Sequence, residues 1–512
     1  MLDVHRLVRG GGALIAAALL ASAGCSGDDD SDDGAAETDT TATTVDRPDG
    51  PVADLSEELT GGHGVFLGSP DAFASDGSYI VEVDEPGYVQ EEFVASGTAS
   101  SYVVDGELTA DGEWVVEPDQ TADYRTRVLV RRPEDPDDFS GVAIVEWLNV
   151  SGGVDADAGY TSMKEEIFRQ GHAYVGVSAQ LIGIEGGPVL VEVDVPGAEF
   201  AGVGAKAVDP ERYGSLHHPG DAFSFDIYTQ VARALRQGQA VGDLEPSWLI
   251  ASGQSQSAAA MVSYINGVQP LTQAFDAFFV HSRGGSGMPF PPIGESVDFI
   301  STLGGTASIL RTDTPVPILD VQAENDLFGV LGSAPARQPD SDTFRLWEVA
   351  GTAHADRTLV GDATADLVDC GVPINDAPMH VVARAAMRHL VTWVVEGEPP
   401  PEGARLEVTE GDAPTIRRDE DGIALGGVRT PPVDVPVEVL SGEVGPGTDT
   451  ICILSGSTNP LPAARLAELY PSVEDYEGAY SDAVEDAITA GVVLEDDRAA
   501  IEGYAEPDLV TP

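Results

Sequence analysis

The sequence predicts an α/β fold with a mostly parallel central sheet that is flanked by helices on both faces. Short apolar runs recur between residues 141 and 349, and helical patterns separate them. Strands that are apolar on both faces are typical of parallel sheets covered by helices on each side. The predicted strands are residues 141–148, 172–178, 248–252, 275–280, 316–321 and 344–349.

The elements around this sheet follow other patterns. Alternating runs such as 79–83 and 124–130 precede it and predict an N-terminal antiparallel extension. Residues 224–236 and 256–265 lie between the strands and have a helical pattern. The connection 281–314 is rich in glycine and proline, and a long connection between two sheet strands can cover a site. We therefore predict an inserted cap segment at that position.

The first 51 residues are predicted to lie outside the folded domain. Residues 1–25 contain a short basic region, an apolar run too short to span a bilayer comfortably, and small residues ahead of Cys25. This is the pattern of a signal peptide with a lipobox-like end. Residues 26–51 are acidic with almost no large apolar side chains, which predicts a disordered tether. Residues 52–512, with a polar and acidic tail after Glu396, are assigned to a single domain.

Cys25 is the expected lipidation site, although Ser22 stands where this type of signal usually has leucine. A lipid on Cys25 would anchor the chain to the outer face of the cytoplasmic membrane. Simple secretion is the alternative. Both interpretations predict an extracellular or cell-surface protein whose membrane contact, if any, runs through the N-terminal lipid alone.

The charge of the chain and the motifs it lacks argue against several classes of partner and cofactor. The chain has 26 Lys and Arg against 87 Asp and Glu, a formal net charge of −61. A surface this acidic repels phosphate backbones and anionic headgroups, so we expect no nucleic-acid partner. The sequence also has no phosphate-binding loop, no zinc-protease helix motif and no cysteine cluster, so we predict no cofactor and no metal.

Three cysteines are present, and one of them is assigned to the anchor. That leaves Cys370 and Cys452. In an oxidising compartment two remaining cysteines most simply form one disulfide. Two buried free thiols are the alternative.

The strongest local motif lies directly after the predicted strand 248–252 and directly before the helix 256–265. It reads Gly-Gln-Ser-Gln-Ser-Ala, with Ser255 at the strand-to-helix turn. Such a turn holds a serine hydroxyl above the edge of the sheet, and small neighbours are needed because backbones approach closely there. Ser257 replaces the usual second glycine. We predict that Ser255 is a nucleophile; the alternative is a helix N-cap.

A serine hydroxyl needs a base, and His354 is the best placed of the nine histidines. It lies in a loop immediately after the last predicted strand, where a base would reach the edge of the sheet. His281, just after the strand 275–280, is the second choice. The remaining histidines lie near the N-terminus, in a polar loop, at a strand start or in helical patterns.

The base in turn needs a carboxylate to orient it. Asp326 follows the penultimate strand at the expected spacing, and Glu324 is close enough to compete. The order Ser255, Asp326, His354 is the one found in α/β-hydrolases and differs from the orders of chymotrypsin-like and subtilisin-like proteases.

Backbone amides should stabilise the oxyanion of a tetrahedral intermediate. We expect one donor from Gln256, at the start of the helix. The second is expected from the loop that begins at Asn149, where Gly152 and Gly153 let amides face inward. Glu146, an acid inside an apolar strand, is expected to have a hydrogen-bonded structural role.

Several segments together resemble a family of bacterial α/β-hydrolase-domain proteins, which includes secreted proteins and lipoproteins. The resemblance covers the chain from about Gly64 to the C-terminus. It implies the α/β-hydrolase fold and the nucleophile Ser255, and less directly Asp326 and His354. The segments that carry it are residues 146–153, 253–258, 281–284, 369–375 and 456–458.

The residues and the resemblance predict an exported serine hydrolase that cleaves a small-molecule carboxylic ester. Ester is preferred over amide by analogy with the fold. A peptidase or amidase on the same Ser255, Asp326 and His354 is the alternative enzyme. A surface lipoprotein that uses the fold only to bind a ligand is the alternative from another class.

Overall fold

The computed structural model describes residues 47–69, 81–83, 85–193, 197–411, 413–447 and 449–510. The expected signal peptide, Cys25 and the tether up to residue 46 lie outside the described residues. Arg47, assigned to the tether from sequence, donates to the carbonyl of Gln273 and pairs with Asp276. The folded unit therefore begins at Arg47. No described helix is both long and apolar enough to cross a membrane.

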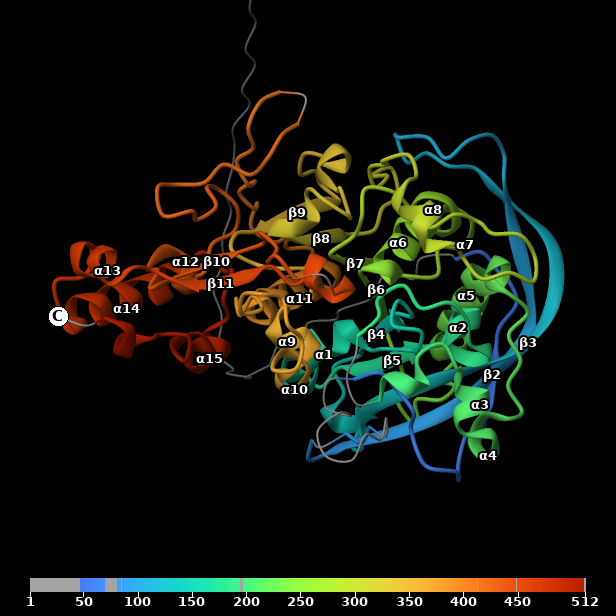
Figure 1. Cartoon of the computed structure of the whole chain (residues 1–512). Coiled ribbons are helices and arrows are strands. Elements are labelled where there is room, and N and C mark those ends of the chain that lie inside the picture. The colour runs from blue at the N-terminus through green and yellow to red at the C-terminus, as the bar shows by residue number, and fades with distance from the viewer. Residues whose placement is uncertain are drawn as a thin grey trace, which may run out of the picture. The chain divides into compact units, whose positions relative to one another are not determined.

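A nine-stranded sheet with the order β1-β2-β3-β5-β4-β6-β7-β8-β9 forms the centre of this unit (Figure 1). Strands β4 to β9 are parallel to one another, whereas β1, β2 and β3 pair in antiparallel fashion and β3 joins β5. The α/β class and the mostly parallel sheet are confirmed. The strands are β1 (Asp54–Glu58), β2 (Tyr88–Val104), β3 (Val116–Pro133), β4 (Val142–Trp147), β5 (Ala173–Val177), β6 (Trp248–Gln254), β7 (Ala277–His281), β8 (Ile318–Ala323) and β9 (Phe344–Val349).

Both faces of the parallel sheet are buried, as its apolar strands require. On one face Ile144, Phe279 and Leu319 pack in one cluster with residues of helices α1 (Ala158–Arg169) and α11 (Met379–Glu396). On the other face the strand side chains pack with helices α5 (Ser224–Arg236) and α6 (Gln256–Ser263). The edge at which β4 to β9 end is thereby held rigid, and the site described below lies there.

The antiparallel extension differs in detail from the prediction. Residues 81–83 form no strand, and 79–80 lie outside the described residues. The extension is instead the long hairpin of β2 and β3, which continues well past the predicted strand at 124–130 and joins the parallel sheet through β5. Its alternating pattern is local, whereas its length depends on pairing with a partner strand.

Both predicted helices begin at the predicted residue, and one of them ends earlier than predicted. Helix α5 has the predicted bounds, whereas α6 ends at Ser263 and continues as a π-helical turn over Tyr264–Val268. The shorter helices are α2 (Leu181–Glu185), α3 (Ala205–Val208), α4 (Pro210–Tyr213), α7 (Gln269–Thr272), α8 (Phe299–Leu303), α9 (Arg357–Val360), α10 (Asp362–Ala365) and α12 (Pro431–Asp434).

The region after α11 has a small core of its own. It contains the hairpin β10 (Glu438–Ser441) and β11 (Ser457–Pro460) and three helices. Their side chains form a cluster that includes Val381 of α11, so the tail is attached to a helix of the sheet. The helices are α13 (Ala463–Leu469), α14 (Val473–Thr489) and α15 (Arg498–Glu502).

Glu146 is a structural residue, as expected. It is fully buried in β4 and accepts the N–H groups of Gly159 and Tyr160 at 2.7 and 2.9 Å and the hydroxyl of Tyr174 at 2.8 Å. These bonds satisfy free amides at the start of α1. Burial raises the pKa of Glu146 to about 7, because a charged carboxylate loses its hydration there.

Candidate active site

Ser255 lies at a sharp turn between the end of β6 and the start of α6. Its φ is 60° and its ψ is −118°, a strained conformation for a residue with a side chain. Gly253 is required at this turn, because a Cβ there would lie 2.6 Å from the carbonyl oxygen of Ser257. The Ser257 hydroxyl accepts from the Gln254 N–H at 3.0 Å and donates to the Gln254 carbonyl at 2.8 Å. The serine that replaces the usual glycine therefore closes the turn.

The structure brings Ser255, His354 and Asp326 into one hydrogen-bonded chain. His354 Nε2 lies 2.7 Å from Ser255 Oγ, and His354 Nδ1 lies 2.7 Å from Asp326 Oδ1. The other carboxylate oxygen of Asp326 accepts the N–H of Ala323 at 2.7 Å. Asp326 has no solvent exposure and His354 is 5% exposed. The imidazole is thus placed to take a proton from the serine hydroxyl while the carboxylate orients it.

His281, the second choice for the base, does not contact the Ser255 hydroxyl and supports the turn through its backbone. Its carbonyl oxygen accepts the Ser255 N–H at 2.9 Å, so its backbone supports the turn. Neither ring nitrogen has a partner among the described residues, and neither contacts the Ser255 hydroxyl. Burial lowers the pKa of His281 to about 4, which keeps the ring neutral.

Glu324, the alternative acid, is bound elsewhere. Its carboxylate accepts the N–H groups of Gly351 at 2.7 Å and Gly442 at 2.9 Å, and it pairs with Arg418 at 2.6 Å. The turn Glu324–Asp326 directs the two acids to different neighbours. Glu324 links the loop before His354 to the segment beyond α11, and Asp326 alone of the two contacts the imidazole.

Asn325, which lies between the two acids, was not singled out from the sequence. Its Oδ1 accepts the His354 N–H at 2.7 Å, and its Nδ2 donates to the carbonyl of Leu454 at 3.1 Å. The same carbonyl accepts the N–H of Ala355 at 3.0 Å. Asn325 therefore fixes the backbone of the histidine loop to a C-terminal segment. An asparagine between two acids carries no pattern that would reveal this from sequence.

Within the loop that was expected to supply the second oxyanion donor, the N–H of Asn149 itself is not free for that role. Its N–H already donates to the carbonyl of Ala156 at 2.9 Å, because the two residues form a β-bridge. Its side chain instead ties the loop to the turn: Nδ2 donates to the Gln254 carbonyl at 2.9 Å, and Oδ1 accepts the Ser151 N–H at 2.8 Å. Gln256 begins α6, so its N–H is one of the free amides of that helix start.

A family model for the alpha/beta hydrolase domain matches residues 50–502. The chain belongs to this family. No curated protein sequence matches it. Among solved structures, it is 13% identical to an α/β serine hydrolase without lid from Xanthomonas campestris, with 57% of this chain and 94% of that chain covered and a TM-score of 0.28. It is 13% identical to an esterase from the fungus Rhizomucor miehei, with 62% and 87% covered and a TM-score of 0.31.

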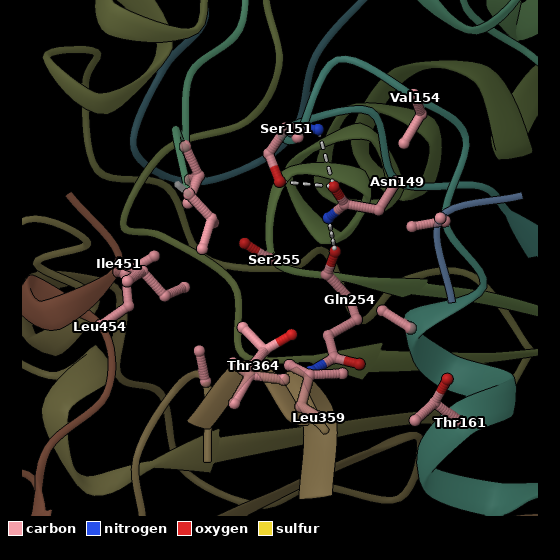
Figure 2. A pocket seen from close by; sticks show the side chains of 18 of the residues that line it. Asn149, Ser151, Val154, Thr161, Gln254, Ser255, Leu359, Thr364, Ile451 and Leu454 are labelled. Atoms are coloured by element: carbon pink, nitrogen blue, oxygen red, sulfur yellow. Dashed lines mark hydrogen bonds between the residues drawn. The ribbon is translucent and has the colours of Figure 1, made fainter. Parts of the chain in front are cut away.

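Two cavities border Ser255 and His354 in this α/β hydrolase. The larger, of about 240 Å³, is shown in Figure 2, and the smaller has about 90 Å³. Apart from His354, no ionisable side chain of the described residues lines either one. Apolar residues of the larger cavity include Val154, Val191, Leu359, Val360, Ile451 and Leu454. Those of the smaller include Leu190, Met288, Phe299, Leu303, Leu331 and Ile453.

The segment predicted to form a cap does border the site. Met288, Phe299 and Leu303 of the connection 281–314 line the smaller cavity. Arg283 holds this connection in place: it pairs with Asp320 of β8 and donates to two backbone carbonyls. Two further lining segments, around Val191 and around Ile451, were missed because their approach to the site depends on tertiary packing.

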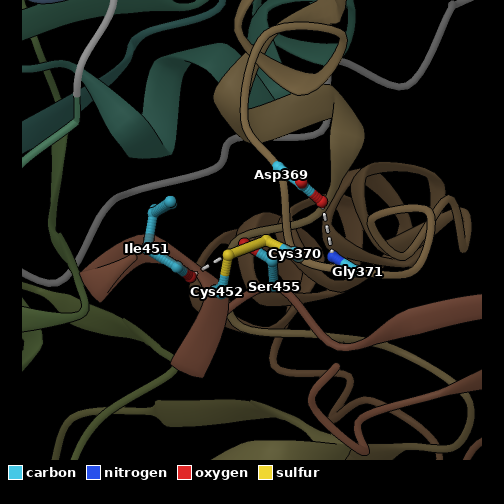
Figure 3. The surroundings of a disulfide bond; sticks show 6 residues. All are labelled: Asp369, Cys370, Gly371, Ile451, Cys452 and Ser455. Carbon is cyan, nitrogen blue, oxygen red and sulfur yellow. Dashed lines mark hydrogen bonds between the residues drawn. A yellow bond between two sulfur atoms is a disulfide. The ribbon is translucent and has the colours of Figure 1, made fainter. Parts of the chain in front are cut away.

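A disulfide joins Cys370 to Cys452 beside the site (Figure 3). Both cysteines are buried. Cys452 lies in the short turn Thr450–Ile453, and its neighbour Ile451 lines the larger cavity. The bond therefore fixes one wall of the cavity covalently. It also selects the disulfide over the alternative of two free thiols.

Replacing both Cys370 and Cys452 with serine should lower the free energy of unfolding by about 4 kcal/mol, because the bond closes a loop of 82 residues. Urea unfolding of the oxidised protein, the reduced protein and the double variant measures this. The reduced protein and the double variant should unfold at the same urea concentration, below that of the oxidised protein. Three coincident curves, or free thiols in the unfolded but unreduced protein, would contradict the prediction.

Proposed function

We propose that this α/β hydrolase is a serine esterase that cleaves a neutral carboxylic ester through an acyl-enzyme. The observation that carries the proposal is the chain of two 2.7 Å contacts from Ser255 Oγ through His354 to buried Asp326 at a strained turn. A serine hydroxyl that is held at such a turn and bonded to an oriented imidazole is the arrangement that activates a serine as a nucleophile.

The reaction has two halves, acylation of Ser255 and hydrolysis of the acyl-enzyme. Ser255 Oγ attacks the carbonyl carbon while its proton moves to His354 Nε2, and the tetrahedral intermediate collapses as that proton passes to the leaving alcohol oxygen. Water then attacks the acyl-enzyme, with the same imidazole taking and returning a proton, and the carboxylic acid leaves. Asp326 accepts the Nδ1–H of His354 in both halves and orients the imidazole.

Two N–H groups are available for the oxyanion. One is that of Gln256 at the start of α6. In the loop after β4, the N–H groups of Asn149, Val150 and Ser151 donate to Ala156, Gln256 and Asn149, respectively. Gly152 is the next residue, and it borders the larger cavity. We assign the second donor to Gly152.

The cavities favour an uncharged substrate. Both border the nucleophile. Apart from His354, the described residues that line them offer no cation to neutralise an anionic substrate and no acid to pair with a cationic one. Transfer of an unpaired charge into such surroundings is costly. An ester with apolar groups on both sides of the carbonyl fits this lining.

Active-site labelling tests the proposal most directly. A fluorophosphonate probe should modify the protein, and mass spectrometry should place the adduct on Ser255. In a panel of p-nitrophenyl esters and matched anilides, the protein should cleave the esters. Cleavage of the anilides alone would indicate an amidase, and a protein inert to the probe but stabilised by a neutral ligand would indicate a binding protein.

We also propose that the chain is exported and lipid-anchored at Cys25. The disulfide supports an oxidising compartment. Cells fed a palmitate analogue should incorporate it into the protein, and Cys25→Ala should abolish the label. Label retained in that variant would refute lipidation at Cys25.

A further inference from the structure

The larger cavity is lined in part by Gln254, a glutamine whose side chain the catalytic arrangement does not use. Gln254 is the last residue of β6 and directly precedes Ser255. It lines the cavity, yet it is only 2% exposed. Its Oε1 is buried without a hydrogen-bond partner among the described residues. Gln254 therefore presents an unsatisfied carboxamide beside the nucleophile.

Gln256, on the other side of Ser255, has a carboxamide that is hydrogen-bonded to other residues of the protein. Its Nε2 donates to Gln180 at 2.7 Å, and its Oε1 accepts the N–H of Val150 at 3.2 Å. These contacts bind the start of α6 to the loop after β4. Both polar atoms of the Gln256 side chain therefore have protein partners, whereas the Oε1 of Gln254 has none among the described residues.

The backbone of Gln254 is fixed, so its side chain projects from a rigid point. Its N–H and carbonyl both bond to the Ser257 hydroxyl, and the carbonyl also accepts Asn149 Nδ2. Figure 2 shows the side chain extending away from Asn149, on the side of the cavity that also carries Leu359 and Thr364. A substrate in this cavity therefore lies within reach of a carboxamide held close to the reacting atoms.

Burial without a partner has a definite energetic consequence. When a substrate displaces water from this cavity, the amide of Gln254 loses any partner that water supplied. A hydrocarbon substrate leaves it unpaired, whereas a substrate oxygen or N–H in the right place replaces the lost bond. Apart from Asn149 and His354, the remaining lining is apolar or hydroxylic, so the complementary group should be uncharged.

We propose that Gln254 is a specificity-determining residue that selects esters with one neutral hydrogen-bonding oxygen on the part bound in the larger cavity. A hydroxyl, ether or ketone oxygen on an otherwise apolar body has the required chemistry. The proposal rests on the proposed esterase function and deepens it. Whether the acyl or the alcohol part of the ester occupies this cavity is decided by the two arms of the test.

The test compares matched substrates on the purified protein. The acyl arm uses p-nitrophenyl hexanoate with its monohydroxy and monoketo derivatives. The alcohol arm uses acetates of hexanol and of its monohydroxy and monoketo derivatives. In one arm, kcat/KM should favour the best-placed oxygenated substrate by about 10-fold, since a bond to an otherwise unpaired buried group is the discriminating contact. Gln254→Leu should remove that preference.

Gln322→Leu is the matched control. Gln322 is a buried glutamine of strand β8, two strands away from β6, whose Oε1 is also unpartnered, but it lines neither cavity. This variant should keep the preference of the parent protein. Thermal unfolding of all variants checks that they are folded.

Gln254→Glu gives a second readout with a side chain of nearly the same size as glutamine. A carboxylate accepts hydrogen bonds but donates none, so at a pH that ionises the introduced acid this variant should lose the preference for ketones and keep it for alcohols. Absence of a preference in both arms, or an equal preference in the parent and in the folded Gln254→Leu variant, would overturn the inference. Those results leave Ser255-dependent ester hydrolysis intact, whereas failure of the proposed function would show as no hydrolysis in either arm.

Discussion

Replacing Ser255 with alanine is expected to lower kcat for ester hydrolysis by about 10⁴- to 10⁶-fold, because removal of the nucleophile leaves only the oxyanion donors and substrate binding. The alanine side chain cannot form the acyl-enzyme, and the 2.7 Å contact with His354 is lost. Steady-state rates with p-nitrophenyl butyrate measure the effect. Labelling by a fluorophosphonate should vanish in parallel.

Ser252→Ala is the matched control for this substitution. Ser252 lies three residues earlier in β6, is buried, and has a hydroxyl without a partner among the described residues. It borders neither cavity, so this variant should retain both activity and labelling. Activity of Ser255→Ala within 10-fold of the parent would remove Ser255 from the mechanism, since that loss is far smaller than removal of a nucleophile produces.

Replacing Asp326 with asparagine should lower kcat by about 10⁴-fold with little change in the fold. The N–H of Ala323 at 2.7 Å requires an acceptor at one branch of the side chain. An asparagine that keeps its oxygen there turns its NH₂ toward His354 Nδ1. The imidazole must then accept at Nδ1 and carry its proton on Nε2, the tautomer that cannot take a proton from Ser255.

Glu324→Gln separates this effect from general disruption of the same turn. Glu324 is fully buried and pairs with Arg418, so breaking the pair should cost about 3 kcal/mol of stability. Because Glu324 does not contact His354, kcat of the folded variant should fall by less than about 10-fold, far less than for loss of the acid. Urea unfolding and steady-state kinetics on both variants provide the comparison. A larger loss of kcat in Glu324→Gln than in Asp326→Asn would reverse the assignment.

The sequence was informative where function depends on local order along the chain. Apolar runs gave the parallel strands because both faces of that sheet are buried, and the strand-to-helix context of Ser255 marked the strained turn. His354 could be singled out because it follows the last strand directly. These features are set by neighbours in sequence.

The rest depended on contacts between distant segments. Spacing favoured Asp326, but Glu324 lies only two residues away, and the turn Glu324–Asp326 shows which of the two acids contacts the imidazole. Asn149 seemed a donor by position, but a bridge to Ala156 uses its N–H. The cavity walls around Val191 and Ile451 come from outside the strand–helix pattern, so no periodicity predicts them.

The contacts of Asn325 and Glu324 have a consequence for how small this enzyme can be made. The sheet and the turn at Ser255 are complete by α11, yet the loops that carry the acid and the base are held by Leu454, Arg418 and Gly442. Truncation after α11 would spare the nucleophile and release its partners. The C-terminal hundred or so residues are in effect the frame of the proposed proton relay, and engineering that shortens the chain must replace that frame.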